Sequence, residues 1–468
     1  MALPDPGDWH GSRMATSLGS GVDEHGKDRP REGSVGIAHG TWLGIQADIA
    51  TAVGAAVTSI GVSRALGPEK RGIFFLAFAT ATLIGVVGNL GMATTGIVYA
   101  ANREIPLRQL HGLAVGVSLA IGALAALLFL PLEGFWSAHV LKGFDTTMFV
   151  LLCAGVPPVV YIQIVLSTLT GLGRIPATTR IRVIVQLGTP PVLVGAAIAT
   201  QSAQWTQAGW LLTVMANAVA AGVYMAATAA RPSRPSWASA REAISFGGRS
   251  WVGTLAHQGY LRADVYFLSA RSGPGLVGIY SLASVFAERI SMIGTAAYSA
   301  SAKRVGSSKP EDSVQVTAQL IRVLIILMVP TAALLAAAGF PMIPLVFGEQ
   351  FGSAALPFAL LLPGTVCLAL WFPLSLFIVS SLRRPGTTTL LMSAAMLVSF
   401  PLYYLMIGSW GMTGAAIASS LVYSLLFALG VAAVVRSTDV GPADLLPRRA
   451  DLTRLVGFVR TSLGRMSA

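Results

Sequence analysis

Apolar runs of about twenty residues or more recur along the whole chain, separated by short polar segments. A helix rises ~1.5 Å per residue, so about twenty apolar residues cross the ~30 Å hydrocarbon core of a bilayer. In that core every backbone polar group needs an internal partner, and runs of this length obtain one as helices. We expect an all-α polytopic membrane protein with about twelve transmembrane helices, at residues 41–62, 72–98, 110–131, 147–169, 181–200, 207–229, 250–270, 276–301, 313–338, 353–380, 389–407 and 411–435.

The lysines and arginines support this arrangement, because cytoplasmic loops of membrane proteins carry an excess of them. With the N-terminus in the cytoplasm and twelve spans, the cytoplasmic side holds 25 of the 32 Lys and Arg when Arg182 and Arg322, in the cytoplasmic halves of their spans, are counted with it, and the outer loops hold five. The remaining two, Arg262 and Arg289, lie near the middle of their spans. The net charge of +12 therefore reflects membrane topology, and we expect no nucleic-acid partner. Both termini are expected in the cytoplasm.

Two pairs of similar segments indicate an internal repeat. Gly67–Ala77 (GPEKRGIFFLA) matches Gly273–Ala283 (GPGLVGIYSLA), and Arg174–Thr179 (RIPATT) matches Arg383–Thr388 (RRPGTT). The offsets are 206 and 209 residues, and each pair falls on one side of the membrane. This pattern predicts two parallel six-helix repeats, related by a pseudo-two-fold axis along the membrane normal. Chance similarity between turns rich in small residues is the alternative.

The same pattern divides the chain into five parts. Residues 1–36 are polar and acidic with no signal-peptide core, and we expect a disordered cytoplasmic tail. Residues 37–229 form the N-lobe and residues 247–436 the C-lobe, joined by a Pro- and Ser-rich cytoplasmic linker at 230–246. Residues 437–468 are expected to form a cytoplasmic basic amphipathic tail, in which 448–465 make a helix on the inner leaflet, with a frayed basic tail as the alternative.

No pattern of residues typical of an enzyme stands out. The chain shows no nucleophile elbow, no Gly-rich phosphate loop and no Cys/His spacing of a metal site. We therefore expect no catalytic residues, no metal and no cofactor. Two homologous lobes around a cavity are instead the architecture of an alternating-access transporter, which can require a coupling proton or sodium ion.

Besides Arg182 and Arg322 in the cytoplasmic halves of their spans, five charged residues lie inside the expected spans, namely Asp48, Arg262, Asp264, Glu288 and Arg289. A charge in the middle of a bilayer costs ~2.5–3.5 kcal/mol on insertion scales, so these side chains should face one another or a wet cavity. One interpretation is an ion pair, either Asp264 with Arg289 or Glu288 with Arg262, that fixes two helices together. The other is a cationic site for an anionic head group, with Asp48, Asp264 and Glu288 left for ion coupling or charge pairing. The sequence leaves both open.

Neutral polar residues within the spans predict a partly hydrophilic interior. Taken singly, each is more often an interhelical hydrogen bond than a ligand. As a set we expect them to line the cavity; they are Gln46, Asn89, Gln163, Gln186, Asn217, His257 and Gln258.

Several segments resemble the polysaccharide (O-antigen type) flippases of the multidrug/oligosaccharidyl-lipid/polysaccharide transporter superfamily. They are RALGPEKRGIFFLA, LRADVYFLSARSGPGLVGIYSLASVFAERI, LRRPGTTT and GMTGAAIASSLVYSLL, and the likeness covers about residues 36–436. It implies two six-helix lobes in a V shape, in the cytoplasmic membrane of a bacterium. It also implies a lipid-linked oligosaccharide as substrate, moved from the inner to the outer leaflet, with membrane lipids as surroundings. By that likeness Arg262 and Arg289 would bind the pyrophosphate of the substrate or an acidic sugar.

Three other functions stay open. A multidrug exporter of the same superfamily, driven by protons or sodium, would favour an acid-lined cavity, whereas here two arginines offset three acids. A lipid II flippase would carry two more helices and a strongly cationic cavity. A membrane scaffold without transport activity is the third. For a polysaccharide flippase, a polymerase and glycosyltransferases would be expected partners.

Overall fold

The computed structural model describes residues 32–228, 231–307, 309–448, 450, 451 and 453, with side chains described from residue 51 onward. Within these ranges the chain is helical and contains no β-strand. The helices are α1 (Glu32–Gly88), α2 (Met92–Asn102), α3 (Leu107–Phe129), α4 (Glu133–His139), α5 (Thr146–Gly171), α6 (Ile175–Thr200), α7 (Ala203–Thr228), α8 (Trp237–Ser272), α9 (Pro274–Glu288), α10 (Ser291–Ser307), α11 (Pro310–Phe347), α12 (Ala355–Ser380) and α13 (Pro385–Val435). Two short 3-10 helices, η1 (Glu349–Ala354) and η2 (Pro442–Leu445), complete the set.

The long helices α1 and α13 are each a hairpin of two spans. In α1 the chain reverses at Gly67, whose φ of 70° and ψ of 177° are not helical. Thr51 and Phe78 line one cavity, although 27 residues of straight helix would separate them by ~40 Å. In α13 the reversal is at Gly411, with φ 55° and ψ −131°. A positive φ costs glycine little because it has no Cβ, which explains the residue type at both turns.

These hairpins reconcile the expected and observed spans. Nine helices among the described residues are long and apolar enough to cross a membrane, when α1 and α13 each count once. Counting each hairpin as two spans gives eleven, and α8 runs beside them as the twelfth. Charged residues, including Arg262 and Asp264, lower the hydropathy of α8. The all-α architecture expected from the apolar runs is therefore confirmed.

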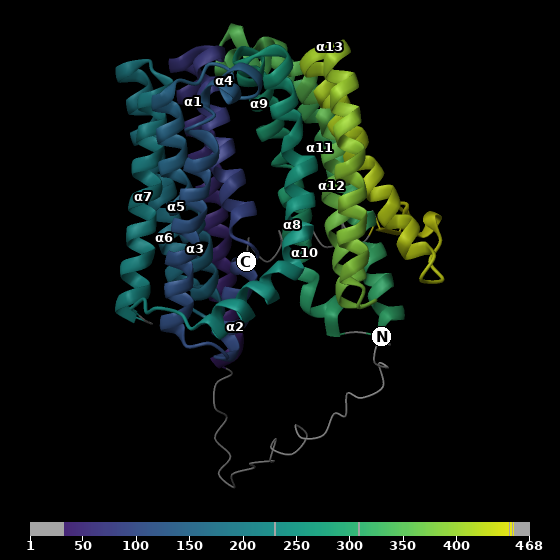
Figure 1. Cartoon of the computed structure of the whole chain (residues 1–468). Coiled ribbons are helices and arrows are strands. Elements are labelled where there is room, and N and C mark those ends of the chain that lie inside the picture. Colours follow the sequence, from purple (N-terminus) through teal and green to yellow (C-terminus); the bar gives the residue numbers. More distant parts are fainter. Residues whose placement is uncertain (1–31, 229–230, 308, 449, 452, 454–468) are drawn as a thin grey trace, which may run out of the picture.

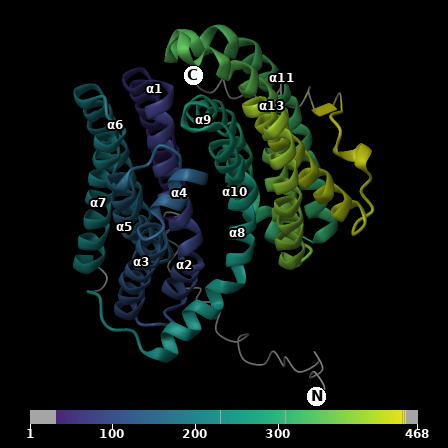
Figure 2. The same ribbon diagram turned by 45° about the horizontal axis from the view of Figure 1, so that its top comes forward.

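The helices form two lobes that converge at one end of the molecule (Figure 1). Helices α1, α3, α5, α6 and α7 make up the N-lobe, and α8 to α13 make up the C-lobe. Near that end α1 and α9 lie side by side between the lobes (Figure 2). The lobes splay apart toward the opposite end, which carries α2 and the first turns of α8.

Reciprocal glycine contacts close the converging end. A Cβ added to Gly72 would lie 1.8 Å from the carbonyl oxygen of Pro274, and one added to Gly278 would lie 1.9 Å from that of Pro68. Only glycine fits at both places, because real Cβ contacts this short do not occur. Arg71, beside Gly72, donates hydrogen bonds across the junction to the carbonyl of Gly278 and to a serine hydroxyl.

The first pair of repeated segments has the same local structure in both lobes. Gly67 and Gly273 have φ of 70° and 83° and ψ of 177° and 178°, and a proline follows each of them. The contacts of Gly72 and Gly278 also exchange roles between the lobes, as a two-fold axis requires. The second pair marks the beginnings of α6 and α13, each with a proline in its first turn. The two parallel repeats are thus visible in the fold.

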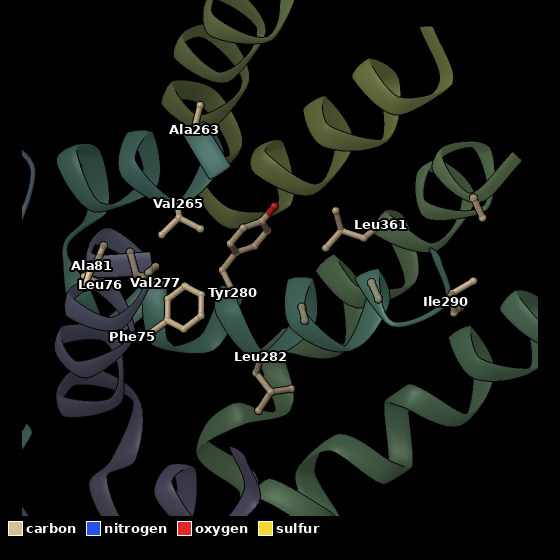
Figure 3. Close-up of a cluster of buried hydrophobic side chains, with 14 of the residues drawn as sticks. Phe75, Leu76, Ala81, Ala263, Val265, Val277, Tyr280, Leu282, Ile290 and Leu361 are labelled. Atoms are coloured by element: carbon tan, nitrogen blue, oxygen red, sulfur yellow. The ribbon is translucent and has the colours of Figure 1, made fainter. Parts of the chain in front are cut away.

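Apolar packing continues below the glycine contact. Phe75 of α1 lies beside Val277 and Tyr280 of α9, with Val265 of α8 next to them (Figure 3). All four side chains are buried. Helix α8 is also tied to the N-lobe at the other end, where the Trp251 indole donates to a carbonyl of α1 at 2.5 Å.

Three boundaries differ from the expected domains. Helix α1 begins at Glu32, so the last part of the expected tail 1–36 is helical; residues 1–31 lie outside the described ranges. Helix α8 begins at Trp237, inside the expected linker 230–246, because Ser236 accepts a hydrogen bond from the backbone of Ser239 and caps it.

The third difference is in the C-terminal segment expected to lie on the membrane. Its first part packs on α11, where Arg322 forms a buried ion pair of 2.9 Å with Asp451. Arg322 also donates to the carbonyl of Asp444 at 2.6 Å. Residues 452 and 454–468, the rest of the expected amphipathic helix, lie outside the described residues.

Candidate functional site: two cavities between the lobes

A cavity of about 370 Å³ lies between the lobes, lined by α1 on one side and by α8, α9, α10 and α12 on the other. Its α1 wall is mainly apolar, with Phe75, Phe78 and Val86 among its residues. Thr82 of α1 is polar, and the other polar groups come from the C-lobe; they are His257, Gln258, Arg262, Glu288, Arg289 and Ser291. We call this space the charged cavity.

Arg262 and Glu288 form an ion pair inside the charged cavity. The two guanidinium nitrogens of Arg262 lie 3.1 and 3.0 Å from the two carboxylate oxygens of Glu288. This two-point geometry matches the planar fork of arginine to a carboxylate. The side chains keep 28% and 17% of their exposure, so the pair faces the cavity while packing on its wall. Of the two pairings left open by the sequence, the structure forms Glu288 with Arg262.

Arg289 behaves differently from Arg262. Its side chain is exposed, and among the described residues its one hydrogen bond is a weak one of 3.6 Å to the sulfur of Met292. It stands between the end of α9 at Glu288 and the start of α10 at Ser291, where the helix is broken. Consecutive residues of a helix point about 100° apart, so Arg289 and its neighbour Glu288 face different directions. A guanidinium without a described carboxylate partner thus faces the cavity.

Asp264 forms no ion pair with either arginine in the described part of the chain and is buried inside the C-lobe. It is 2% exposed, and it accepts hydrogen bonds from the Tyr280 hydroxyl at 2.6 Å and the Ser419 hydroxyl at 3.2 Å. The backbone N–H of Val265 donates to its other oxygen at 2.8 Å. Asp264 was expected to face a wet cavity or an arginine. Instead three donors from α8, α9 and α13 satisfy the carboxylate.

A second cavity of about 370 Å³ lies on the N-lobe side, and we call it the N-lobe chamber. It shares Phe75, Phe78, Val285 and Arg289 with the charged cavity, so the two spaces are neighbours. The remaining lining comes largely from α1, α6 and α7; it includes Thr58, Ser59, Phe74, Gln186, Thr189, Trp210, Thr213 and Asn217.

The neutral polar residues expected to line the interior fall into three groups. His257 and Gln258 line the charged cavity, and Gln186 and Asn217 line the N-lobe chamber. Asn89 instead donates to Gln163 at 2.8 Å, as an interhelical hydrogen bond apart from both cavities. The side chains of Gln46 and Asp48 lie outside the described residues.

The sequence did not single out several residues that shape the site. Arg71 lies in the first repeated segment, at a position where the two copies differ. Trp210 and Ser419 lie in apolar spans with nothing nearby in the sequence to mark them. The only hint in the sequence of the contact between the lobes was the neighbouring arginine and glycine at the end of GPEKRG. Among the described residues, no group of three or more His, Cys, Asp or Glu could hold a metal ion.

A family model described as polysaccharide biosynthesis protein matches residues 37–305, more than half of the chain. No curated protein sequence gives a significant match.

Solved structures with the same fold belong to transporters. The lipid II flippase MurJ in an inward closed conformation is 12% identical, with a TM-score of 0.68 over 86% of this chain and 89% of that one. An inward-facing MATE family multidrug transporter is 14% identical, with a TM-score of 0.64 over 83% and 94%. A MOP superfamily transporter from Pyrococcus furiosus is 14% identical, with a TM-score of 0.55 over 85% and 92%. At these identities the likeness concerns the fold, which is that of the MOP superfamily transporters.

Proposed function

The chain belongs to the polysaccharide biosynthesis protein family, and from that premise we propose that it moves a polyprenyl-pyrophosphate-linked oligosaccharide across a membrane. The direction would be from the inner to the outer leaflet of a bacterial cytoplasmic membrane, with both termini in the cytoplasm. The observation that carries this proposal is Arg289, an exposed guanidinium in a cavity between two lobes.

The chemistry of Arg289 suits a pyrophosphate. A guanidinium stays charged at all physiological pH values and offers paired donors that match phosphate oxygens. Two opposite charges 4 Å apart attract by about 4 kcal/mol at an effective dielectric constant of 20. Glu288 already neutralises Arg262, so Arg289 would make the first contact with the pyrophosphate. Arg262 would bind it afterwards by leaving Glu288.

The two lobes supply the means of transport. We propose that residues 37–229 and 247–436 move against each other, opening the end that Gly72 and Gly278 close in the described conformation. The saccharide would cross in the polar interior while the prenyl chain remains in lipid, since exposing that chain to a polar cavity would cost ~0.8 kcal/mol per CH₂ group.

A coupling proton or sodium ion would act only if it bound one conformation better than the other. Glu288 is a candidate, because its partner Arg262 faces the substrate cavity. Asp264 is the second candidate, because a buried carboxylate with three donors changes its hydrogen bonds when the surrounding helices shift.

The multidrug exporter is less well supported. A cationic drug entering the charged cavity would meet Arg289, whose charge no described carboxylate offsets, while Glu288 is occupied. A lipid II flippase would use the same pyrophosphate chemistry and differ in the sugar. Glycosyltransferases that build the saccharide and a polymerase that consumes it are the partners we propose.

The test is transport in proteoliposomes. A fluorescent polyprenyl pyrophosphate carrying a short saccharide is placed in both leaflets, and transport is scored as the change in protection from a membrane-impermeant quencher. Replacing Arg289 with Gln should slow transport at least tenfold, because the first phosphate contact loses its charge.

Arg180→Gln is the matched control, since Arg180 is exposed on α6 and lines neither cavity. It should transport as the wild type does. Undiminished transport by Arg289→Gln would overturn the proposal, as would equal losses in the two variants.

A further inference from the structure

The N-lobe chamber differs in chemistry from the charged cavity beside it. Threonine hydroxyls line much of it, and three of them donate to carbonyls of their own helices at 2.8 Å: Thr58 to Gly54, Thr189 to Val185, and Thr213 to Trp210. A hydroxyl has one hydrogen to donate and two lone pairs to accept with. Since the three hydroxyl hydrogens are bonded within the helices, the threonine oxygens are left to accept hydrogen bonds from a ligand in the chamber.

Two further lining groups have no partner at all. The hydroxyl of Ser59 and the side-chain oxygen of Asn217 are buried atoms without a described hydrogen bond. An unsatisfied buried polar atom costs ~1–3 kcal/mol, so native proteins rarely leave one without a purpose. The amide oxygen of Asn217 can only accept. The chamber is therefore prepared for a guest that brings hydrogen-bond donors.

Aromatic rings form part of the same wall. Phe78 and Trp210 stand edge to face with ring centroids 5.6 Å apart, and Phe74 and Phe75 line the chamber near them. Aromatic faces carry a negative partial charge and attract the slightly positive C–H groups of a flat apolar surface. A pyranose ring offers such a face on one side and hydroxyl donors around its edge.

Charge is confined to the border of the chamber. Arg71 is committed to Gly278 and Ser281 across the lobe junction, and Arg289 is shared with the charged cavity. No carboxylate is found among the described residues of the lining. The amides of Gln186 and Asn217 are neutral, so among the lining residues Arg289 is the positive charge left to hold a phosphate, and the interior suits an uncharged guest.

We infer that the N-lobe chamber is a binding subsite for uncharged, hydroxyl-rich sugar rings, adjoining the pyrophosphate site at Arg289. This inference rests on the proposed function. It adds that the sugars are recognised by hydroxyl and amide acceptors from Ser59, Thr189 and Asn217 and by the aromatic pair. A volume of about 370 Å³ falls in the range of ~300–1,000 Å³ typical of small-ligand sites.

The experiment compares two probes in detergent solution. One is a short-chain polyprenyl pyrophosphate carrying a neutral disaccharide, and the other is the same lipid without sugar. We expect the wild type to bind the glycosylated probe about tenfold more tightly, the effect of one or two net hydrogen bonds. The double substitution Thr189→Val with Asn217→Leu keeps the branching and the number of side-chain heavy atoms and removes two acceptors. It should abolish this preference and leave affinity for the bare lipid unchanged.

Thr331→Val is the matched control, because Thr331 also donates to its own helix, at 2.7 Å, but faces outward from α11. It should keep the tenfold preference. Equal wild-type affinity for the two probes would overturn the sugar subsite, and so would a preference that survives the double substitution. In both results, retained Arg289-dependent binding of the bare lipid would leave the proposed function standing. Failure of the wild type to bind either probe would overturn both proposals.

Discussion

The contact between Gly72 and Gly278 allows a quantitative prediction about which end of the cavity opens. A methyl group on Gly278 would lie 1.9 Å from the Pro68 oxygen, whereas ordinary contact begins at 3.4 Å. Gly278→Ala must therefore separate α1 from α9 by about 1.5 Å, the difference between these distances. Backbone atoms form both sides of the contact, so no side-chain rotation can relieve it.

The separation also weakens the hydrogen bonds that Arg71 makes across the junction. A hydrogen bond to a charged group contributes ~1.5–3 kcal/mol, which corresponds to roughly a ten- to hundredfold change in a conformational equilibrium. We expect Gly278→Ala to fold normally but to favour a conformation in which this end is open. Transport should slow because the closed state is rarely reached.

Spin-label distances between Glu69 and Glu349, both exposed near the junction, measure this shift after replacing each with cysteine. Gly275→Ala is the control on the same helix, because nothing lies within 4 Å of its added Cβ. A distance distribution for Gly278→Ala that matches the control would show that the glycine contact does not decide which end is open.

Two further predictions concern buried charges. Asp264→Leu leaves two hydroxyl donors without their acceptor, so the melting temperature in detergent should fall by several degrees. Asp264→Asn should lower it by less. Equal stability of the two variants would contradict the hydrogen-bonded role of Asp264. Asp451→Asn should release the C-terminal segment from Arg322, so trypsin should cut at Arg448 faster than in the wild type. Unchanged cleavage would mean that the ion pair does not hold the segment.

Most of the fold could be predicted from the sequence, because the length and hydropathy of its apolar runs mark most of the membrane spans. The positions of the turns at Gly67 and Gly273 followed from the repeated glycine and proline. The pairing of the charges could not be predicted. The two open pairings, Glu288 with Arg262 and Asp264 with Arg289, differ in how the side chains of α8 and α9 are turned toward each other, and the sequence of an apolar span does not fix that rotation.

The surroundings of Asp264 were also beyond the sequence. Two of its donors are Tyr280 and Ser419, which are 16 and 155 residues away. The sequence of a long apolar span does not show toward which neighbouring helix a polar side chain points. The N-lobe chamber was predictable only in part. Gln186 and Asn217 were expected in the interior. The threonines act as acceptors because their hydroxyl hydrogens are bonded to carbonyls of their own helices, which the sequence does not show.

The exchange of roles between Gly72 and Gly278 has the form of an isologous contact, the kind that joins two identical subunits about a two-fold axis. Once two copies share one chain, each position is free to diverge. At the same offset of 206 residues, Arg262, Asp264, Glu288 and Arg289 correspond to Ala56, Thr58, Thr82 and Leu83. The symmetric backbone has thus acquired two chemically different halves. For the substrate proposed above, with one charged and one neutral end, the two unlike halves would favour one binding orientation over its reverse.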